Sequence, residues 1–185
     1  QALGYVAGRG EVRDEGGVER ADPKDRIRLH QAIMLAQAEL GDGDLDSAGE
    51  RLRRAIREDA GLVDAHQMLG SIALQQSRHE AGLEHFGAAL ELSPDHTASL
   101  WGMATSYRRL GRFEDAIPGY RRIQQLLPGD SKAAVALSEV LVDLGRLGDA
   151  LSEVEAVTQD NPAARDRRAG ARFFGADRIL WRDLA

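Results

Sequence analysis

The histidines offer the most direct prospect of metal chemistry in this sequence. His79 is followed by Glu80, and His85 lies six positions after His79. A zinc-binding helix of the hydrolytic type needs two histidines four positions apart, so that both rings project from one face. A spacing of six separates the rings by about 240° around a helix. We therefore predict exposed helix residues here, and no metal site.

Three aspartates resemble the first half of a calcium loop. Asp42, Asp44 and Asp46 alternate as calcium ligands do, but the sharp turn needs glycine where Ser47 stands. The bidentate glutamate is replaced by Arg53. We therefore predict that these aspartates form a turn and cap a helix N-terminus.

Other catalytic chemistry lacks the residues it needs. The chain contains no cysteine, which removes disulfides, thiolate metal sites and cysteine nucleophiles together. It also has no Gly-x-Ser-x-Gly elbow, phosphate-binding loop or dinucleotide fingerprint. We predict a chain that is not an enzyme and that carries no cofactor.

Composition narrows the partners. The 43% hydrophobic and 29% charged residues are typical of a folded soluble protein, and no apolar run approaches the ~20 residues of a spanning helix. A net charge of -6 disfavours nucleic acid and anionic lipid. Two basic clusters remain candidates for an acidic partner or phosphate. They are Arg108, Arg109 and Arg112, and Arg165, Arg167, Arg168 and Arg172.

The elements that would position any site come from an internal repeat. Pro94, Pro128 and Pro162 are spaced by 34 residues. Units 29–62, 63–96, 97–130 and 131–164 align without an insertion. The aligned columns include Leu35, Leu69, Met103 and Leu137, then Ala48, Gly82, Ala116 and Ala150, then Leu52, Phe86, Tyr120 and Val154.

Each unit has the pattern of two helices. Apolar residues step by three and four, as in Leu45, Ala48 and Leu52. Between the two halves stands Gly43, Gly111 or Gly145, with Ser77 in the remaining place. Proline follows most units, so the pattern predicts helix, tight turn, helix, turn, and eight helices of about 12 to 15 residues.

These features together resemble the tetratricopeptide repeat. The resemblance rests on the 34-residue period, the Leu69-Gly70 type of pair, Tyr107, the small Ala116, the aromatic Phe86 or Tyr120 and the closing proline, and it covers residues 29–162. It implies an all-α, right-handed superhelical solenoid of antiparallel helix pairs, with four repeats over 23–162. Leu35 is then expected in the core column, while Ala32, Ala36 and Glu39 mark the first repeat as an end repeat.

The two ends differ from the repeats. Glycines among charged residues predict a flexible linker over 1–22, and its start at Gln1, without Met or leader, suggests a processed or excised piece. This segment looks like the junction after the catalytic domain of repeat-containing bacterial sulfatases, which implies an extracytoplasmic module of such an enzyme. Without that attachment, the cytoplasm is expected. Residues 163–185 are predicted to form a partial fifth repeat and a capping helix, with Phe173, Phe174 and Trp181 covering the open end.

The candidate binding surface follows from repeat columns 2, 5, 9 and 12 of the first helices, about 130° from the core columns. The resemblance implies that they line a concave peptide groove. The predicted residues are His30, Ile33, Gln37, Asp64, Gln67, Ser71, Leu74, Trp101, Thr105, Arg108, Lys132, Val135 and Glu139, and the same columns also contain Leu40, Ala98 and Val142.

Two details limit the ligand. Trp101 either contacts a ligand or packs on a neighbouring helix, and the sequence leaves both roles open. The carboxylate clamp of chaperone-binding members is absent, because Ile33, Gln37 and Gly102 occupy its places. We predict a non-catalytic scaffold for a protein or peptide, without nucleic acid or membrane insertion. The alternative is a structural module that positions an attached domain or self-associates as a homo-oligomer.

Overall fold

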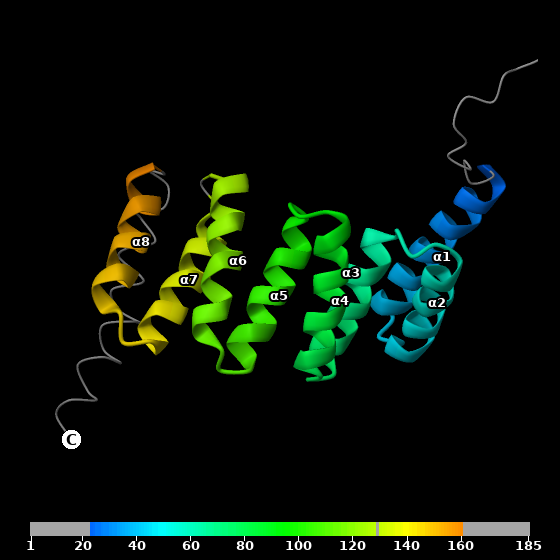
Figure 1. The fold of residues 1–185 in the computed structure, drawn as a ribbon, viewed down its shortest axis with the longest axis horizontal. Helices are drawn as coiled ribbons and strands as arrows, with labels where there is room; N and C mark the ends of the chain where they lie inside the picture. The colour runs from blue at the N-terminus through cyan, green and yellow to red at the C-terminus, as the bar shows by residue number, and fades with distance from the viewer. Residues whose placement is uncertain (1–22, 129, 161–185) are drawn as a thin grey trace, which may run out of the picture.

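The computed structural model describes residues 23–128 and 130–160. Its regular structure there is entirely α-helical, and the eight predicted helices are confirmed (Figure 1). The predicted linker and capping segment lie outside the described residues. The helices are α1 (Pro23–Gly41), α2 (Leu45–Glu58), α3 (Val63–Gln75), α4 (His79–Leu92), α5 (Thr97–Arg109), α6 (Phe113–Leu126), α7 (Ser131–Asp143) and α8 (Leu147–Asp160).

The helices form antiparallel pairs that stack along one axis, with α1 and α2 at one end and α7 and α8 at the other (Figure 1). Each helix packs against the next one in the chain, and α3 also contacts α5. The first helices α3 and α5 therefore approach each other more closely than the second helices α4 and α6 do. We call the side formed by α1, α3, α5 and α7 the inner face. No helix in the described part combines the length and hydropathy needed to cross a membrane.

The tight turns inside the repeats share a left-handed residue. Gly43, Gly111 and Gly145 have φ values of 83°, 72° and 73°, and Ser77 has φ 56°. Glycine adopts this conformation without steric cost, whereas a residue with a Cβ is strained there. Ser77 therefore has the same left-handed backbone conformation as the glycines with which it aligns.

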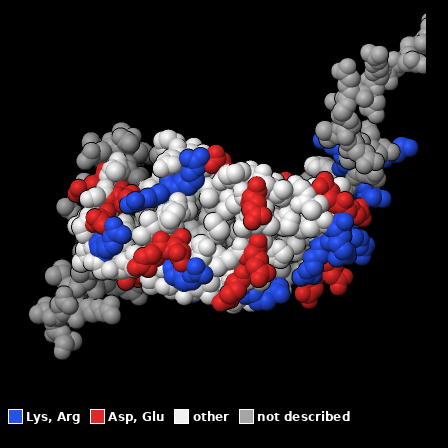
Figure 2. All heavy atoms as spheres, viewed as in Figure 1, with Lys and Arg blue, Asp and Glu red and all other residues white. Residues whose placement is uncertain are grey.

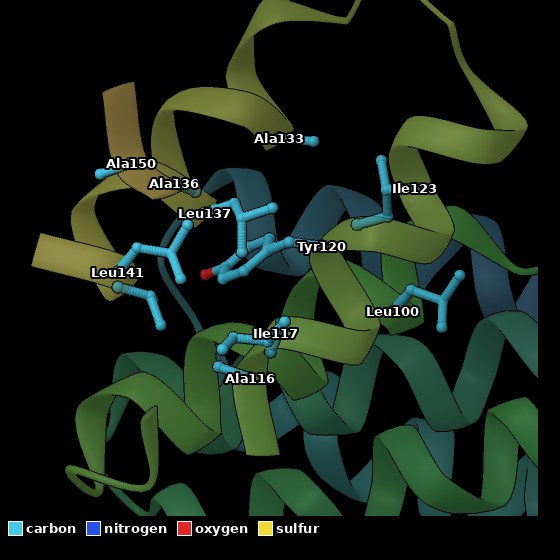
Figure 3. Close-up of a cluster of buried hydrophobic side chains, with 12 residues drawn as sticks. Leu100, Ala116, Ile117, Tyr120, Ile123, Ala133, Ala136, Leu137, Leu141 and Ala150 are labelled. Carbon is cyan, nitrogen blue, oxygen red and sulfur yellow. The ribbon is translucent and has the colours of Figure 1, made fainter. Parts of the chain in front are cut away.

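Large side chains from the second helices fill the space between repeats. Phe86 and Tyr120 are both fully buried. Figure 3 shows the Tyr120 ring beside Leu137 of α7. The Phe86 ring needs glycine on two helices, because a Cβ on Gly70 would lie 2.7 Å from its Cε1 and a Cβ on Gly102 would overlap the ring. Small residues thus permit the close helix approach that the repeat columns predict.

The prediction that Leu35 belongs to the core is wrong. Its side chain is 53% exposed, whereas Leu69 and Leu137 in the same column are 3% and 0% exposed. The second helix of the preceding repeat covers that column in later repeats. No helix precedes α1 within the described residues, so its face toward that side is open.

Candidate functional site

The predicted binding residues occupy the four helices of the inner face, and all thirteen lie at the surface at least in part. Those classed as exposed are His30, Gln37, Asp64, Lys132, Val135 and Glu139. The remaining seven are partly buried. The first helices of four successive repeats therefore bring side chains to one side of the stack, as a binding surface for an extended ligand requires.

Trp101 is partly buried and packs within the molecule. Its ring lies edge-on to Tyr120, with centroids 5.4 Å apart and an interplanar angle of 75°. It also packs against the hydrophobic cluster that joins α5, α6 and α7. Of the two roles that the sequence left open, packing on a neighbouring helix is present, and part of the Trp101 side chain remains at the inner face.

Tyr120 brings a polar group toward the same surface. Its hydroxyl lies 3.4 Å from Oγ1 of Thr105, and either oxygen can be the donor. A buried tyrosine normally gives its hydroxyl a hydrogen-bond partner in this way. The sequence placed Tyr120 only in the core column, so its contact with a predicted groove residue was missed.

Most polar groups of the inner face already have partners. Nη1 of Arg108 on α5 forms an ion pair with Oε2 of Glu139 on α7. Gln67 Nε2 donates a 2.9 Å hydrogen bond to Ser71 Oγ. Asp64 Oδ1 lies 3.8 Å from Nε2 of His96, a residue without a predicted role. The face therefore presents paired polar groups rather than a concentrated charge.

Apolar exposure on the inner face gathers on α7. Val135 and Val142 are 51% and 41% exposed, and they lie about two turns apart on α7, the first helix of the repeat after that of Trp101. The equivalent positions on α3 are Gln67 and the partly buried Leu74. The α5–α7 part of the inner face is consequently the more apolar part.

The basic cluster on α5 is largely neutralised. Arg108 pairs with Glu139, and Arg112 Nε donates a 2.7 Å hydrogen bond to Asp115 Oδ2. The Arg112 guanidinium also lies 4.7 Å from the centroid of the Tyr107 ring, a favourable cation–π distance. This weakens the case for an acidic partner at α5. The second cluster, Arg165 to Arg172, lies outside the described residues.

The histidines of the second repeat form a partly buried group, so the prediction that His79 and His85 are exposed is wrong. The rings of His66 on α3 and His85 on α4 have centroids 6.3 Å apart. Burial lowers the pKa of His85, and the neighbouring His66 lowers it further. In the part of the chain that is described, no group of three side chains could hold a metal ion.

Asp44 takes the capping role that its sequence context predicts. Its carboxylate accepts a 3.0 Å hydrogen bond from the backbone N–H of Ser47 at the start of α2. This hydrogen bond stabilises the ionised form and lowers the pKa of Asp44. A second capping aspartate, Asp130, accepts a 2.8 Å hydrogen bond from the backbone N–H of Lys132 at the start of α7.

The stacked helix pairs and their continuous surface define a helical-repeat scaffold. A tetratricopeptide repeat model matches residues 33–97 and 68–131, and a second one matches residues 109–171. The chain belongs to the tetratricopeptide repeat family. Proteins of this class typically bind their partners on an extended surface and do not contain a catalytic centre there.

Curated relatives are much longer than this chain. It is 30% identical over 129 residues to "Protein CTR9 homolog" of Arabidopsis thaliana, which covers 66% of this chain and 12% of that protein. It is 30% identical over 105 residues to "Superkiller complex protein 3" of Mus musculus, covering 57% and 7% respectively. The chain thus spans about an eighth or less of these two relatives.

Solved structures with low sequence identity share the fold. A crystal structure of MamA superposes with a TM-score of 0.69 at 17% identity, covering 80% of this chain and 78% of that one. YrrB, described as a TPR protein with an unusual peptide-binding site, gives a TM-score of 0.65 at 20% identity, with 77% of each chain covered.

Proposed function

We propose that this chain is a non-catalytic scaffold that binds a protein or peptide segment along its inner face. The observation that carries this proposal is the exposure of Val135 and Val142 on the same inner face as the partly buried Trp101. Apolar side chains held on a rigid helix surface are suited to anchor a ligand, since their burial stabilises a complex without a large ordering cost.

The surroundings of this apolar group favour an extended peptide. The neighbouring polar groups Gln67, Ser71 and Thr105 come from successive repeats and can exchange hydrogen bonds with a peptide backbone. The Arg108–Glu139 pair adds no net charge at the centre. We therefore expect a ligand with apolar anchors near α5 and α7 and few charges between them. The peptide-binding site described for YrrB supports this ligand class.

A peptide-library selection tests the proposal. Peptides selected on the whole chain are titrated calorimetrically against the wild type, Val135→Asp and Val142→Asp. We expect each variant to weaken binding by about 30-fold, which corresponds to about 2 kcal/mol at a hot spot. Thermal unfolding should change little, because both side chains are exposed.

Leu92→Asp is the matched control, since Leu92 on α4 is 46% exposed and lies outside the inner face. Its affinity for the peptides should equal that of the wild type. Equal losses in all three variants, or no loss in the α7 variants, would show that the peptides bind elsewhere.

We also propose that the chain is the C-terminal module of a sulfatase-like enzyme. This rests on the resemblance of residues 1–22, which lie outside the described part. The full reading frame tests it: a sulfatase domain upstream of Gln1, with Cys or Ser two residues before a proline, would support this origin. An upstream region of another class would remove it, together with the expected extracytoplasmic location.

A further inference from the structure

One stripe of α1 is exposed although its equivalents are covered in every later repeat. We call Gln31, Met34, Leu35 and Ala38 the end stripe. All four are exposed, and Met34 and Leu35 are each 53% exposed. The equivalent residues are buried, except for the partly buried Met103. They are Ala65, Met68, Leu69 and Ile72 on α3, Ser99, Gly102, Met103 and Ser106 on α5, and Ala133, Ala136, Leu137 and Val140 on α7.

The element that covers this stripe in later repeats is the second helix of the preceding repeat. Leu52 of α2 shares a hydrophobic cluster with Met68 and Leu69 of α3. The Phe86 ring of α4 fills the space above Gly102 of α5. Tyr120 of α6 lies beside Leu137 of α7 (Figure 3). The end stripe therefore has the shape that accepts a helix of this kind.

The last described helix presents a matching face. Leu147 and Leu151 of α8 are 44% and 65% exposed. Their equivalents on α6 are Phe113, which is partly buried, and Ile117, which is 9% exposed and packs in the cluster with α7. Val154 of α8 occupies the column of Tyr120 and is partly buried. A second copy of the chain thus provides the helix face that α1 lacks.

Side-chain sizes agree with this pairing. At two junctions inside the chain an aromatic ring on the second helix is matched with glycine or alanine on the next first helix, and at the remaining junction two aliphatic side chains of similar size meet. The pairs are Leu52 with Met68, Phe86 with Gly102, and Tyr120 with Ala136. Met34 repeats the methionine of the first pair, so it fits an aliphatic partner and would exclude a ring. Val154 is such a partner.

Charges at the two ends are complementary. A hollow of about 350 Å³ beside Leu35 is lined by three arginines, one glutamate, one glutamine and apolar residues. Arg28 pairs with Glu58 and Arg51 pairs with Glu39, so the attraction to an acidic helix falls on Arg54. Figure 2 shows this basic patch over α1 and α2, with acidic side chains beside it. In contrast, α8 contains Asp149, Glu153, Glu155 and Asp160 and no Lys or Arg, although Asp149 pairs with Arg146 just before the helix. The lining residues are Arg28, Leu29, Gln31, Ala32, Leu35, Arg51, Arg54, Ala55 and Glu58.

We propose that copies of this chain associate end to end, with α8 of one copy packing on the end stripe of the next. The contact repeats the junction that joins successive repeats within the chain. It is heterologous, so each added copy leaves one end stripe and one α8 available. Assemblies should therefore grow beyond dimers as concentration rises. This inference goes beyond the proposed peptide binding, because it uses the ends of the stack and not the inner face.

Cross-linking tests the pairing directly, since the chain has no cysteine of its own. Met34→Cys and Val154→Cys chains are mixed and oxidised with copper phenanthroline. We expect a disulfide-linked dimer in the mixture and none with either variant alone. A Met34→Cys homodimer would overturn the proposal in favour of a symmetric contact. Met34→Cys mixed with Val142→Cys is the control, and it should not cross-link.

Sedimentation velocity measures the association independently, on the wild-type chain and on variants that carry no added cysteine. The average mass should rise with protein concentration and fall with added NaCl. Leu35→Asp should abolish this rise, Arg54→Glu should weaken association about 10-fold, and Leu92→Asp should behave as the wild type. A wild type that stays monomeric at every concentration would overturn the proposal. That result is expected if residues 161–185 cover α8. A mass increase that survives Leu35→Asp would also overturn it.

Discussion

The second and third junctions between repeats bury an aromatic ring in the same column and accommodate it differently. Phe86 lies against Gly70 and Gly102, whereas the equivalent neighbours of Tyr120 are Ala104 and Ala136. Tyr120 also places its hydroxyl near Thr105 at the inner face. The comparison teaches that a buried ring in this column can be accommodated by glycine or by alanine in the facing columns, so the residue in any one column varies.

The second and third repeats also differ in titratable residues at one further pair of columns. His66 and His85 occupy columns filled by Leu100 and Gly119 in the third repeat. A Cβ on Gly119 would lie 3.3 Å from the Leu100 carbonyl oxygen, so the two columns face each other there as well. The second repeat therefore contains two titratable groups between its helices at columns where the third repeat contains none.

The largest expected effect comes from adding a side chain at Gly102, which faces the Phe86 ring. Gly102→Met should destabilise the chain by about 3 kcal/mol, because the new side chain overlaps the buried ring. Urea unfolding followed by circular dichroism measures this loss. Gly87→Ala is the control, since nothing lies within 4 Å of a Cβ at Gly87. It should stabilise α4 by about 0.5 to 1 kcal/mol.

A compensating change sharpens this comparison. Phe86→Leu combined with Gly102→Met recreates the pair Leu52 and Met68 of the preceding junction. The double variant should lose at least about 1 kcal/mol less than the sum of the single losses. Additive losses would mean that the two columns do not share one volume.

The second effect concerns α6, which has Pro118 where α4 has Glu84. Pro118 is exposed and cannot donate a backbone hydrogen bond to Glu114. Pro118→Ala should therefore stabilise the chain by about 1 to 2 kcal/mol. Calorimetry measures the change, and a lower melting temperature would show that the proline shapes the α6–α7 junction rather than weakening it.

A smaller effect is expected at the tight turns of the second and third repeats. Ser77→Gly should raise stability and Gly111→Ser should lower it, each by about 0.5 to 1 kcal/mol, because both positions have positive φ. Chemical unfolding of the two variants in parallel gives the comparison. If both variants changed stability in the same direction, the two turns would not share the strain of a positive φ.

The smallest effect should appear on acidification. Burial, and then His66, lower the pKa of folded His85 below its ordinary value of about 6.5; Arg53 and Arg78 act in the same sense and Glu84 opposes them. The unfolded chain then binds more protons, so stability falls as pH drops through about 6.5. Between neutral pH and pH 5.5, the melting temperature of His85→Gln should fall by about 1 °C less than that of the wild type. Parallel pH dependences would exclude this contribution.

The repeat pattern predicted the helices and their turns because both depend on local spacing. The pattern placed Ser77 in the glycine column of the tight turns, and the structure adds that its φ is positive like that of the glycines. The exposure of Leu35 could not be predicted this way, since its burial depends on a neighbouring helix and not on α1 itself. Column matching can show which helices a residue faces, but it cannot tell whether such a helix is present.

The candidate surface was predicted by position but not by its contacts. The Arg108–Glu139 pair joins residues 31 positions apart and depends on the rotamers of two long side chains. The His66–His85 contact was missed because only the structure shows that its two columns face each other, in this repeat and in the third. Volumes and charges compared across junctions therefore add information that a single repeat lacks.

Amide chemical-shift mapping tests the binding surface most directly. A library-selected peptide is titrated into the ¹⁵N-labelled whole chain, and shift changes are assigned along the sequence. Our account predicts that the largest changes fall on α5 and α7, around Trp101, Thr105 and Val135. Largest changes on α4 and α6, with the α7 signals unmoved, would contradict it.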